Sequence, residues 1–157
     1  MASKTVEIGK KVPAFKAQAT SEKSIQLSQL KGKKVVLYFY PKDNTPGCTT
    51  ESNEFSENYS KFKKAGAEII GISRDSLKSH EKFKEKFDFP FELISDEDEE
   101  LCQLFDVIKE KNMYGKKVMG IERSTFIIGE DGKLIKEWRK VKVDGHVDEV
   151  LDFVKKN

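Results

Sequence analysis

Uninterrupted apolar runs along the chain predict buried strands. The clearest is Val-Val-Leu-Tyr-Phe-Tyr at 35–40, between a lysine-glycine segment at 31–34 and Pro41. A second run occupies 68–72. Because apolar side chains follow one another here without alternating with polar ones, we expect both faces of these strands to be covered. Shorter runs predict further strands at 91–94, 124–128 and 134–138.

Helical spacing of apolar residues separates these strands. Phe55, Tyr59 and Phe62 recur at intervals of four and three, which predicts one helix over 52–65 that ends before Gly66. The same spacing predicts three more helices, at 77–87, 97–105 and 147–156.

The order of these elements predicts one α/β domain spanning 1–157. Strands and helices alternate, which is typical of three layers with a central mixed β-sheet. Glu130-Asp131-Gly132 is a turn signal that would join the last two strands as a hairpin. Residues 109–120, which are rich in lysine, are expected to be a surface loop. Right-handed crossovers would bring the carboxyl ends of the first strands to one crevice, a usual place for a site.

Composition narrows the class of protein. Apolar residues make up 37% and aromatic residues 10% of the chain, which is enough for a core and argues against disorder. The net charge is +2, although 36% of residues are charged, and the two signs are interspersed. We therefore expect neither a nucleic-acid-binding surface nor a polybasic membrane surface.

The sequence offers no apolar segment long enough to span a membrane, and it has only two cysteines and two histidines for disulfides or a zinc site. No stretch approaches the ~18 apolar residues of a membrane span, and residues 1–7 lack the apolar core of a signal peptide. The only cysteines are Cys48 and Cys102, and neither has a histidine at zinc-ligand spacing. We therefore expect no metal, no other cofactor, and a cytoplasmic location, where thiols stay reduced.

The segment after the strongest strand holds the chemistry. Cys48 follows it by a short turn and would lie in the first turn of the next helix, where unpaired backbone N–H groups and the helix dipole favour a thiolate. The thiolate is the nucleophilic form of cysteine. Thr45 lies three residues earlier, so its hydroxyl can reach the sulfur or a substrate oxygen. Pro41 and Pro46 would fix the turn.

A lone cysteine at a helix start is more often a small buried residue than a nucleophile. The combination of Pro41, Thr45 and Cys48 at a strand-to-helix junction reverses that preference.

These three residues match the active-site motif of the peroxiredoxins. The longer stretch at 39–51 is similar to the bacterioferritin comigratory protein branch of that family, also called PrxQ. Segments 9–15, 71–73 and 120–126 resemble further family blocks, so the resemblance covers nearly the whole chain. It implies a thioredoxin-like fold, a thiol peroxidase acting on hydrogen peroxide and organic hydroperoxides, and a monomer or weak homodimer.

The resemblance also implies residue roles. Cys48 would be the peroxidatic cysteine, Thr45 would hydrogen-bond the peroxide, and Pro41 would shield the pocket. Arg123 matches the family's arginine; beside Cys48 a guanidinium would stabilise the thiolate and polarise the peroxide. The alternative for Arg123 is a surface cation at a strand start. Glu51 can hold Arg123 in place, or it can simply complement the helix dipole.

The chain departs from the family in its second thiol. Many members carry a resolving cysteine five residues after the peroxidatic one, where this chain has Asn53, or on the next helix, where 77–87 has none. Cys102 is either a resolver or a core residue beside Leu101, Leu104 and Phe105. We favour a one-cysteine cycle in which thioredoxin, glutaredoxin or a low-molecular-weight thiol is the reductant.

Other functions are less well supported. A thioredoxin-type reductase would need Cys-x-x-Cys, but Thr45 and Glu51 occupy the positions three residues from Cys48. A redox-sensing or client-holding binding protein on the same scaffold remains the alternative. His80, on the lysine-rich helix, is expected to be solvated, and His146 to lie in a helix-start turn.

Overall fold

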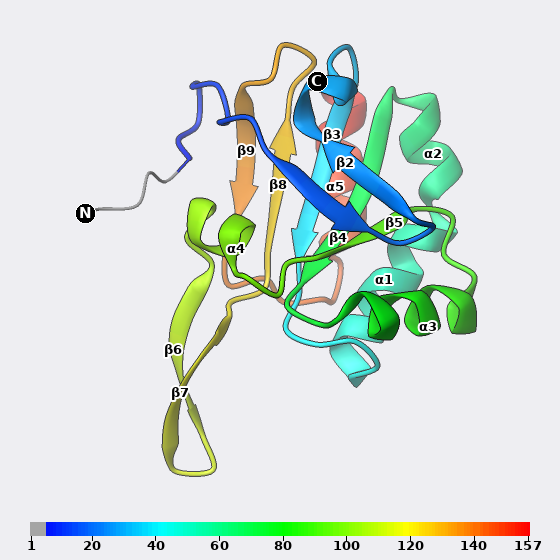
Figure 1. Cartoon of the computed structure of the whole chain (residues 1–157). Helices are drawn as coiled ribbons and strands as arrows, with labels where there is room; N and C mark the ends of the chain where they lie inside the picture. The colour runs from blue at the N-terminus through cyan, green and yellow to red at the C-terminus, as the bar shows by residue number, and fades with distance from the viewer. Residues whose placement is uncertain (1–5) are drawn as a thin grey trace.

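The computed structural model describes residues 6–157, so most of the stretch 1–7 examined for a signal peptide lies outside the described residues. A seven-stranded sheet forms the centre, with strand order β2-β1-β5-β4-β3-β8-β9 (Figure 1). Three parallel strands occupy the middle: β3 (Lys34–Phe39), β4 (Ala67–Ser73) and β5 (Glu92–Ser95). The flanking strands are antiparallel to their neighbours: β1 (Lys16–Ala19), β2 (Lys23–Gln26), β8 (Ser124–Ile128) and β9 (Leu134–Trp138).

Successive side chains of a strand point to opposite faces of a sheet, so this sheet has two cores. One face carries Val35, Leu37 and Phe39 of β3, and the other carries Val36 and Tyr38. The first face is covered by the 3₁₀ helix η1 (Leu27–Leu30) and by α4 (Glu100–Leu104). The second is covered by four helices: α1 (Pro46–Glu57), α2 (Tyr59–Lys64), α3 (Leu77–Phe87) and α5 (His146–Lys156).

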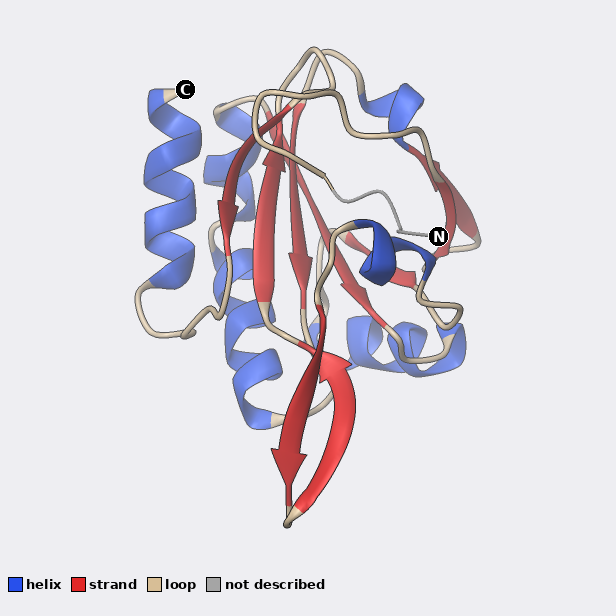
Figure 2. Ribbon diagram, turned by 90° about the vertical axis from the view of Figure 1, so that its left-hand side faces the viewer, coloured by secondary structure: helices blue, strands red, loops and turns tan. Residues whose placement is uncertain are grey.

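The layers are visible in two views. In Figure 1, α4 lies in front of the sheet and α5 behind it, and Figure 2 shows the same separation from the side. The predicted three-layer α/β fold with a mixed sheet is therefore confirmed. Among the described residues, every helix is too short or too polar to cross a membrane.

The predicted helix over 52–65 is wrong in two respects. It begins at Pro46, with Thr45 as its N-cap, and it is interrupted at Asn58. The Asn58 side chain donates to the Glu54 carbonyl at 2.8 Å, and its backbone leaves the helical region at φ −102° and ψ 5°. The Glu54 carbonyl thus accepts from both the side chain and the backbone N–H of Asn58, and asparagine side chains that compete for backbone partners in this way are unfavourable inside a helix.

The predicted surface loop at 109–120 is a β-hairpin. Strands β6 (Ile108–Met113) and β7 (Lys116–Ile121) pair along their length and project from the body of the protein (Figures 1 and 2). Tyr114 and Gly115 form the two-residue turn, with φ values of 53° and 79°. Positive φ at both positions is what a tight hairpin of this kind requires.

Candidate active site

Cys48 lies in the first turn of α1, as predicted. Pro46 is the first helical residue, where its missing N–H removes no helical bond, and Cys48 is the third. The Cys48 side chain is only 1% exposed and belongs to the core that α1 forms with the sheet. The backbone N–H groups of this first turn have no helical acceptor, so they favour negative charge near the sulfur.

Arg123 meets Cys48 across 75 residues of sequence. Its Nη2 donates to Cys48 Sγ at 3.3 Å, and its Nη1 donates to Glu51 Oε1 at 2.6 Å. The pairing of two strands brings Arg123 close to Cys48. Strand β8 runs antiparallel to β3, and Ser124 lies opposite Phe39. The residue before β8 therefore lies beside the chain that leaves β3. The surface-cation alternative for Arg123 is wrong, because its side chain is only 15% exposed.

Gly47 makes room for this guanidinium. A Cβ atom at position 47 would lie 3.2 Å from Arg123 Nη2, closer than an ordinary van der Waals contact. The absence of a side chain between Pro46 and Cys48 thus lets the arginine reach the first turn of α1.

Glu51 is fully buried one turn after Cys48. Burial raises the pKa of its carboxyl to about 7, although the ion pair with Arg123 works in the opposite direction. Its second oxygen, Oε2, has no hydrogen-bond partner in the described structure. Burial lowers the pKa of the Arg123 guanidinium, but the neighbouring Glu51 carboxylate and Cys48 sulfur raise it more. The pKa of Arg123 is therefore above its usual value. The three side chains therefore form one coupled electrostatic group.

Thr45 and Pro41 lie in the loop that joins β3 to α1, and both are half-buried. The Thr45 hydroxyl donates to the Lys42 carbonyl at 2.8 Å, so in this structure it stabilises the loop itself. Its backbone carbonyl accepts from Thr49 N–H at 2.9 Å, the first bond of the helix. The contacts of both residues with a peroxide stay predictions.

Cys102 is not brought to Cys48. It lies in α4, fully buried in the core on the opposite face of the sheet, whereas Cys48 belongs to the core on the α1 face. Its backbone N–H donates to Asp96 Oδ2 at 2.7 Å. Burial and the neighbouring Asp96 carboxylate raise the pKa of the Cys102 thiol well above its usual range. That environment suits an unreactive thiol.

Sequence analysis missed a polar cluster behind the active-site loop. His80 was expected to be solvated, but its side chain is 0% exposed and lies 2.7 Å from Asp43 Oδ2. The spacing contained a signal, because His80 is three residues from both Leu77 and Phe83, on the inward face of α3. Ligand atoms of Asp43, Asp75 and His80 lie within 4.8 Å of one another, but each is already hydrogen-bonded inside the cluster.

Comparison with known proteins decides the family. Residues 8–137 match the AhpC/TSA family. The chain belongs to this family. Its relatives include the peroxiredoxin Bcp of Bacillus subtilis, 52% identical over 151 residues, which are 96% of each chain. The peroxiredoxin Bcp of Xanthomonas campestris is 60% identical over 121 residues, 77% of this chain and 76% of the relative.

Solved peroxiredoxin structures share the fold. A PrxQ from Xylella fastidiosa superposes with a TM-score of 0.92 at 44% identity, covering 98% of both chains. A structure of the Xanthomonas campestris bacterioferritin comigratory protein, determined for insight into its alkyl peroxide reduction activity, gives a TM-score of 0.89 at 49% identity, covering 96% of this chain and 98% of that one. The thioredoxin-like fold predicted from the resemblance is confirmed, and this peroxiredoxin is a thiol peroxidase.

Proposed function

We propose that this peroxiredoxin reduces hydrogen peroxide and organic hydroperoxides through Cys48. The observation that carries the proposal is the hydrogen bond from Arg123 Nη2 to Cys48 Sγ, 3.3 Å long, at the first turn of α1. A charged donor and a helix N-terminus both stabilise the thiolate that must attack. The alkyl peroxide reduction studied in the Xanthomonas campestris relative supports the inclusion of organic hydroperoxides.

The first step is a displacement at oxygen. The Cys48 thiolate attacks one peroxide oxygen, a sulfur–oxygen bond forms, and the oxygen–oxygen bond breaks. The attacked oxygen keeps its hydrogen, so Cys48 becomes a sulfenic acid, and the leaving oxygen takes a proton from solvent and departs as water or an alcohol. Arg123 would stabilise the negative charge that moves onto the leaving oxygen.

Three neighbouring residues support this step. Glu51 holds the guanidinium of Arg123 through its 2.6 Å contact with Nη1. Thr45 would turn its hydroxyl from the Lys42 carbonyl toward a bound peroxide. Pro41 would shield the sulfur from water, because proline brings no N–H that attracts solvent.

We propose an external thiol as the resolver. The central sheet lies between Cys48 and Cys102, and Cys102 is fully buried in the core on the far face. An incoming thiol would attack the sulfenic sulfur and release water, and a second thiol would then break the mixed disulfide and return the Cys48 thiolate. Thioredoxin, glutaredoxin or a low-molecular-weight thiol such as glutathione can supply both equivalents, and a reducing compartment such as the cytoplasm holds all three.

The experiment is an intact mass measurement of reduced protein after one equivalent of hydrogen peroxide, with a sulfenic-acid trap present. We expect one trapped group on Cys48 and a free Cys102, and the Cys102→Ser variant should behave the same. Cys48→Ser is the matched control and should gain no trapped group. A Cys48–Cys102 disulfide as the main product would refute the one-cysteine cycle. An unchanged mass under fast mixing would count against a peroxidase reaction at Cys48 and favour the alternative of a slowly oxidised redox sensor or a client-holding protein.

A further inference from the structure

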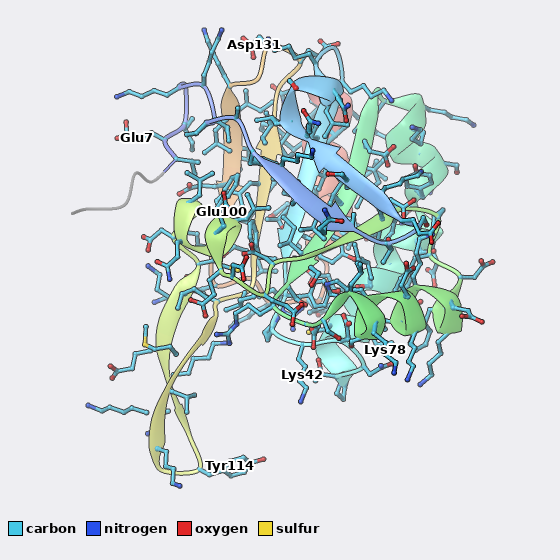
Figure 3. The ribbon with its side chains drawn as sticks, viewed as in Figure 1. Glu7, Lys42, Lys78, Glu100, Tyr114 and Asp131 are labelled. Atoms are coloured by element: carbon cyan, nitrogen blue, oxygen red, sulfur yellow. The ribbon has the colours of Figure 1, made fainter. Side chains whose placement is uncertain are left out.

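A buried polar cluster lies between the loop after β3 and the start of α3. Asp43 and His80 are its buried centre, and hydroxyl and carboxylate groups surround them. Figure 3 labels Lys42 on the loop and Lys78 on α3, the exposed neighbours of this cluster at the same end of the molecule. Buried polar groups are costly unless their hydrogen bonds are complete, and complete networks fix the segments that they join. The members are Tyr40, Asp43, Ser73, Asp75, Ser79 and His80.

Asp43 ties the active-site loop to three neighbouring segments. The Tyr40 hydroxyl donates to its Oδ1 at 2.7 Å. Ser79 Oγ donates to its Oδ2 at 2.8 Å, and His80 Nδ1 is hydrogen-bonded to the same oxygen at 2.7 Å. Its backbone N–H donates to Asp75 Oδ2 at 2.9 Å. One residue of the loop is thus bonded to the end of β3, to the segment after β4 and to α3.

His80 connects Asp43 to the backbone of β5. Its Nε2 lies 2.8 Å from the Ile94 carbonyl oxygen, while its Nδ1 faces Asp43. A carbonyl oxygen can only accept, so Nε2 carries the hydrogen of its bond, while Nδ1 and the Asp43 carboxyl share a second hydrogen bond. The ring therefore bridges two fixed partners, and an apolar side chain of similar size can make neither bond.

The bridged loop is the one that positions the proposed chemistry. The sheet bonding of β3 ends where Tyr40 N–H donates to the Ile72 carbonyl, and α1 begins at Pro46. Between them Asn44 has a φ of 62°, in the left-handed region that asparagine tolerates better than most residues other than glycine. The Thr45 hydroxyl bond to Lys42 stays inside the loop, whereas Asp43 bonds to other parts of the protein.

We propose that His80 is a positioning residue for the reaction at Cys48. With Asp43 it clamps the loop 41–45 against β5 and α3, and this holds Thr45 and the first turn of α1 in the peroxide-reactive arrangement. The inference rests on the proposed function of Cys48. Its consequence is specific: loss of the clamp slows attack on peroxide, which needs the ordered loop, but admits bulkier reagents to Cys48, a residue that is only 1% exposed.

The test measures two rates on reduced protein, with Cys102→Ser as the background. One is the oxidation of Cys48 by hydrogen peroxide, and the other is the alkylation of Cys48 by iodoacetamide. In His80→Leu we expect oxidation to fall at least about ten-fold and alkylation to rise, because small misplacements of a reacting group are costly. Ser79→Ala removes one donor to Asp43 from a half-buried position and should show the same opposite changes, only smaller.

Ser76→Ala is the matched control on the same helix. It removes the N-cap bond from Ser79 N–H to Ser76 Oγ, 3.1 Å long, and leaves the contacts of Asp43 in place. Both rates should stay within about two-fold of the parent.

Each outcome decides the matter. If the parent protein does not react with peroxide, the proposed function of Cys48 is refuted, and the clamp proposal, which rests on it, fails as well. A reactive parent with both rates unchanged in His80→Leu and Ser79→Ala overturns the positioning role. Rates that fall together in His80→Leu, Ser79→Ala and Ser76→Ala also overturn it, since that pattern reports general destabilisation. If His80→Leu does not fold, Ser79→Ala against Ser76→Ala gives the answer.

Discussion

At the scale of single residues, Arg123 combines two contacts in one planar group. Nη1 binds Glu51 and Nη2 binds the Cys48 sulfur, at 2.6 and 3.3 Å. The fixed fork of a guanidinium makes both contacts at once, and a lysine ammonium on a flexible stem does not reproduce that geometry. We therefore expect the effect of Arg123 on the reactivity of Cys48 to depend on the geometry of the guanidinium as well as on its charge.

Arg123→Lys should slow the oxidation of Cys48 by roughly 10²-fold, because one preorganised donor at a reacting centre is worth about that much. Stopped-flow competition with a peroxide-consuming reporter measures the rate. Arg139→Lys is the matched control, since Arg139 also makes forked bonds, to the Phe105 and Asp106 carbonyls. An Arg123→Lys rate equal to that of the parent would show that positive charge without the fork is enough.

The raised pKa of the buried Glu51 carboxyl predicts that the stability of the protein depends on pH. Its carboxyl has a pKa of about 7 in the folded protein against 4.5 for the free group, so the folded state binds the proton more tightly. The free energy of unfolding therefore falls as pH rises from about 4.5 to about 7, by roughly 3 kcal/mol from this group. In Glu51→Gln this contribution is absent, so urea unfolding at pH 5 and pH 8 should show a smaller loss than in the parent.

The exposed Glu57, on the same helix, provides the control for this comparison. Glu57→Gln should keep the pH dependence of the parent. Equal losses of stability in the parent and Glu51→Gln would mean that the buried carboxyl does not titrate in this range.

At the scale of elements, α5 is joined to the sheet at its first residue. His146 is buried there, and its Nε2 lies 2.8 Å from the Thr125 hydroxyl of β8. Burial lowers the pKa of His146 to about 4. The predicted helix-start turn at His146 is confirmed. The burial of the His146 side chain depends on its contact with β8, and the local sequence around His146 does not predict that contact.

His146 predicts a loss of stability in acid, opposite in sign to the effect of Glu51. The unfolded chain binds a proton at His146 near pH 6.5, whereas the folded protein resists it until about pH 4. The free energy of unfolding therefore falls as pH drops from about 6.5 to about 4, by roughly 3 kcal/mol from this group. His146→Gln should lose less stability than the parent over that range in urea unfolding. An identical acid loss in both proteins would contradict the assignment.

At the scale of the whole molecule, the sheet and the hairpin divide the protein into regions of different character. The sheet keeps the two thiols in separate cores. The β6–β7 hairpin stands away from both cores, and Figure 3 labels Tyr114 at its tip. That side chain is 99% exposed, in contrast to the aromatic residues packed against the sheet.

The hairpin tip should be the first site of cleavage by chymotrypsin, because exposed turns are preferred sites of proteolysis. Cleavage after Tyr114 gives fragments 1–114 and 115–157, which mass spectrometry distinguishes. Tyr114→Ser should remove this first cut without lowering the melting temperature. First cleavage at another aromatic residue would contradict the predicted order of accessibility.

The sequence by itself determined the elements that carry strong local signals. Strands at 124–128 and 134–138 and the helix at 77–87 agree with the structure at both ends, because apolar periodicity and turn residues lie within the segments themselves. Cys48 in the first turn of a helix also followed from local order. The β6–β7 hairpin was missed because residues 116–119 of β7 are exposed and the lysine-rich segment carries no apolar alternation.

Only the tertiary structure decided which distant groups meet. The β3–β8 register brought Arg123 to Cys48, and the two faces of the sheet kept Cys102 away from it. The spacing along α3 places His80 on the inward face, but only the tertiary structure supplies its partners Asp43 and Ile94, which come from other segments. For Arg123 and His80 the physical reason is the same: the cost of burying a polar or charged group is offset by partners far away in the sequence, and a linear pattern does not contain that pairing. For Cys102 the reason is the layer order, because a linear pattern does not say which face of the sheet a helix covers.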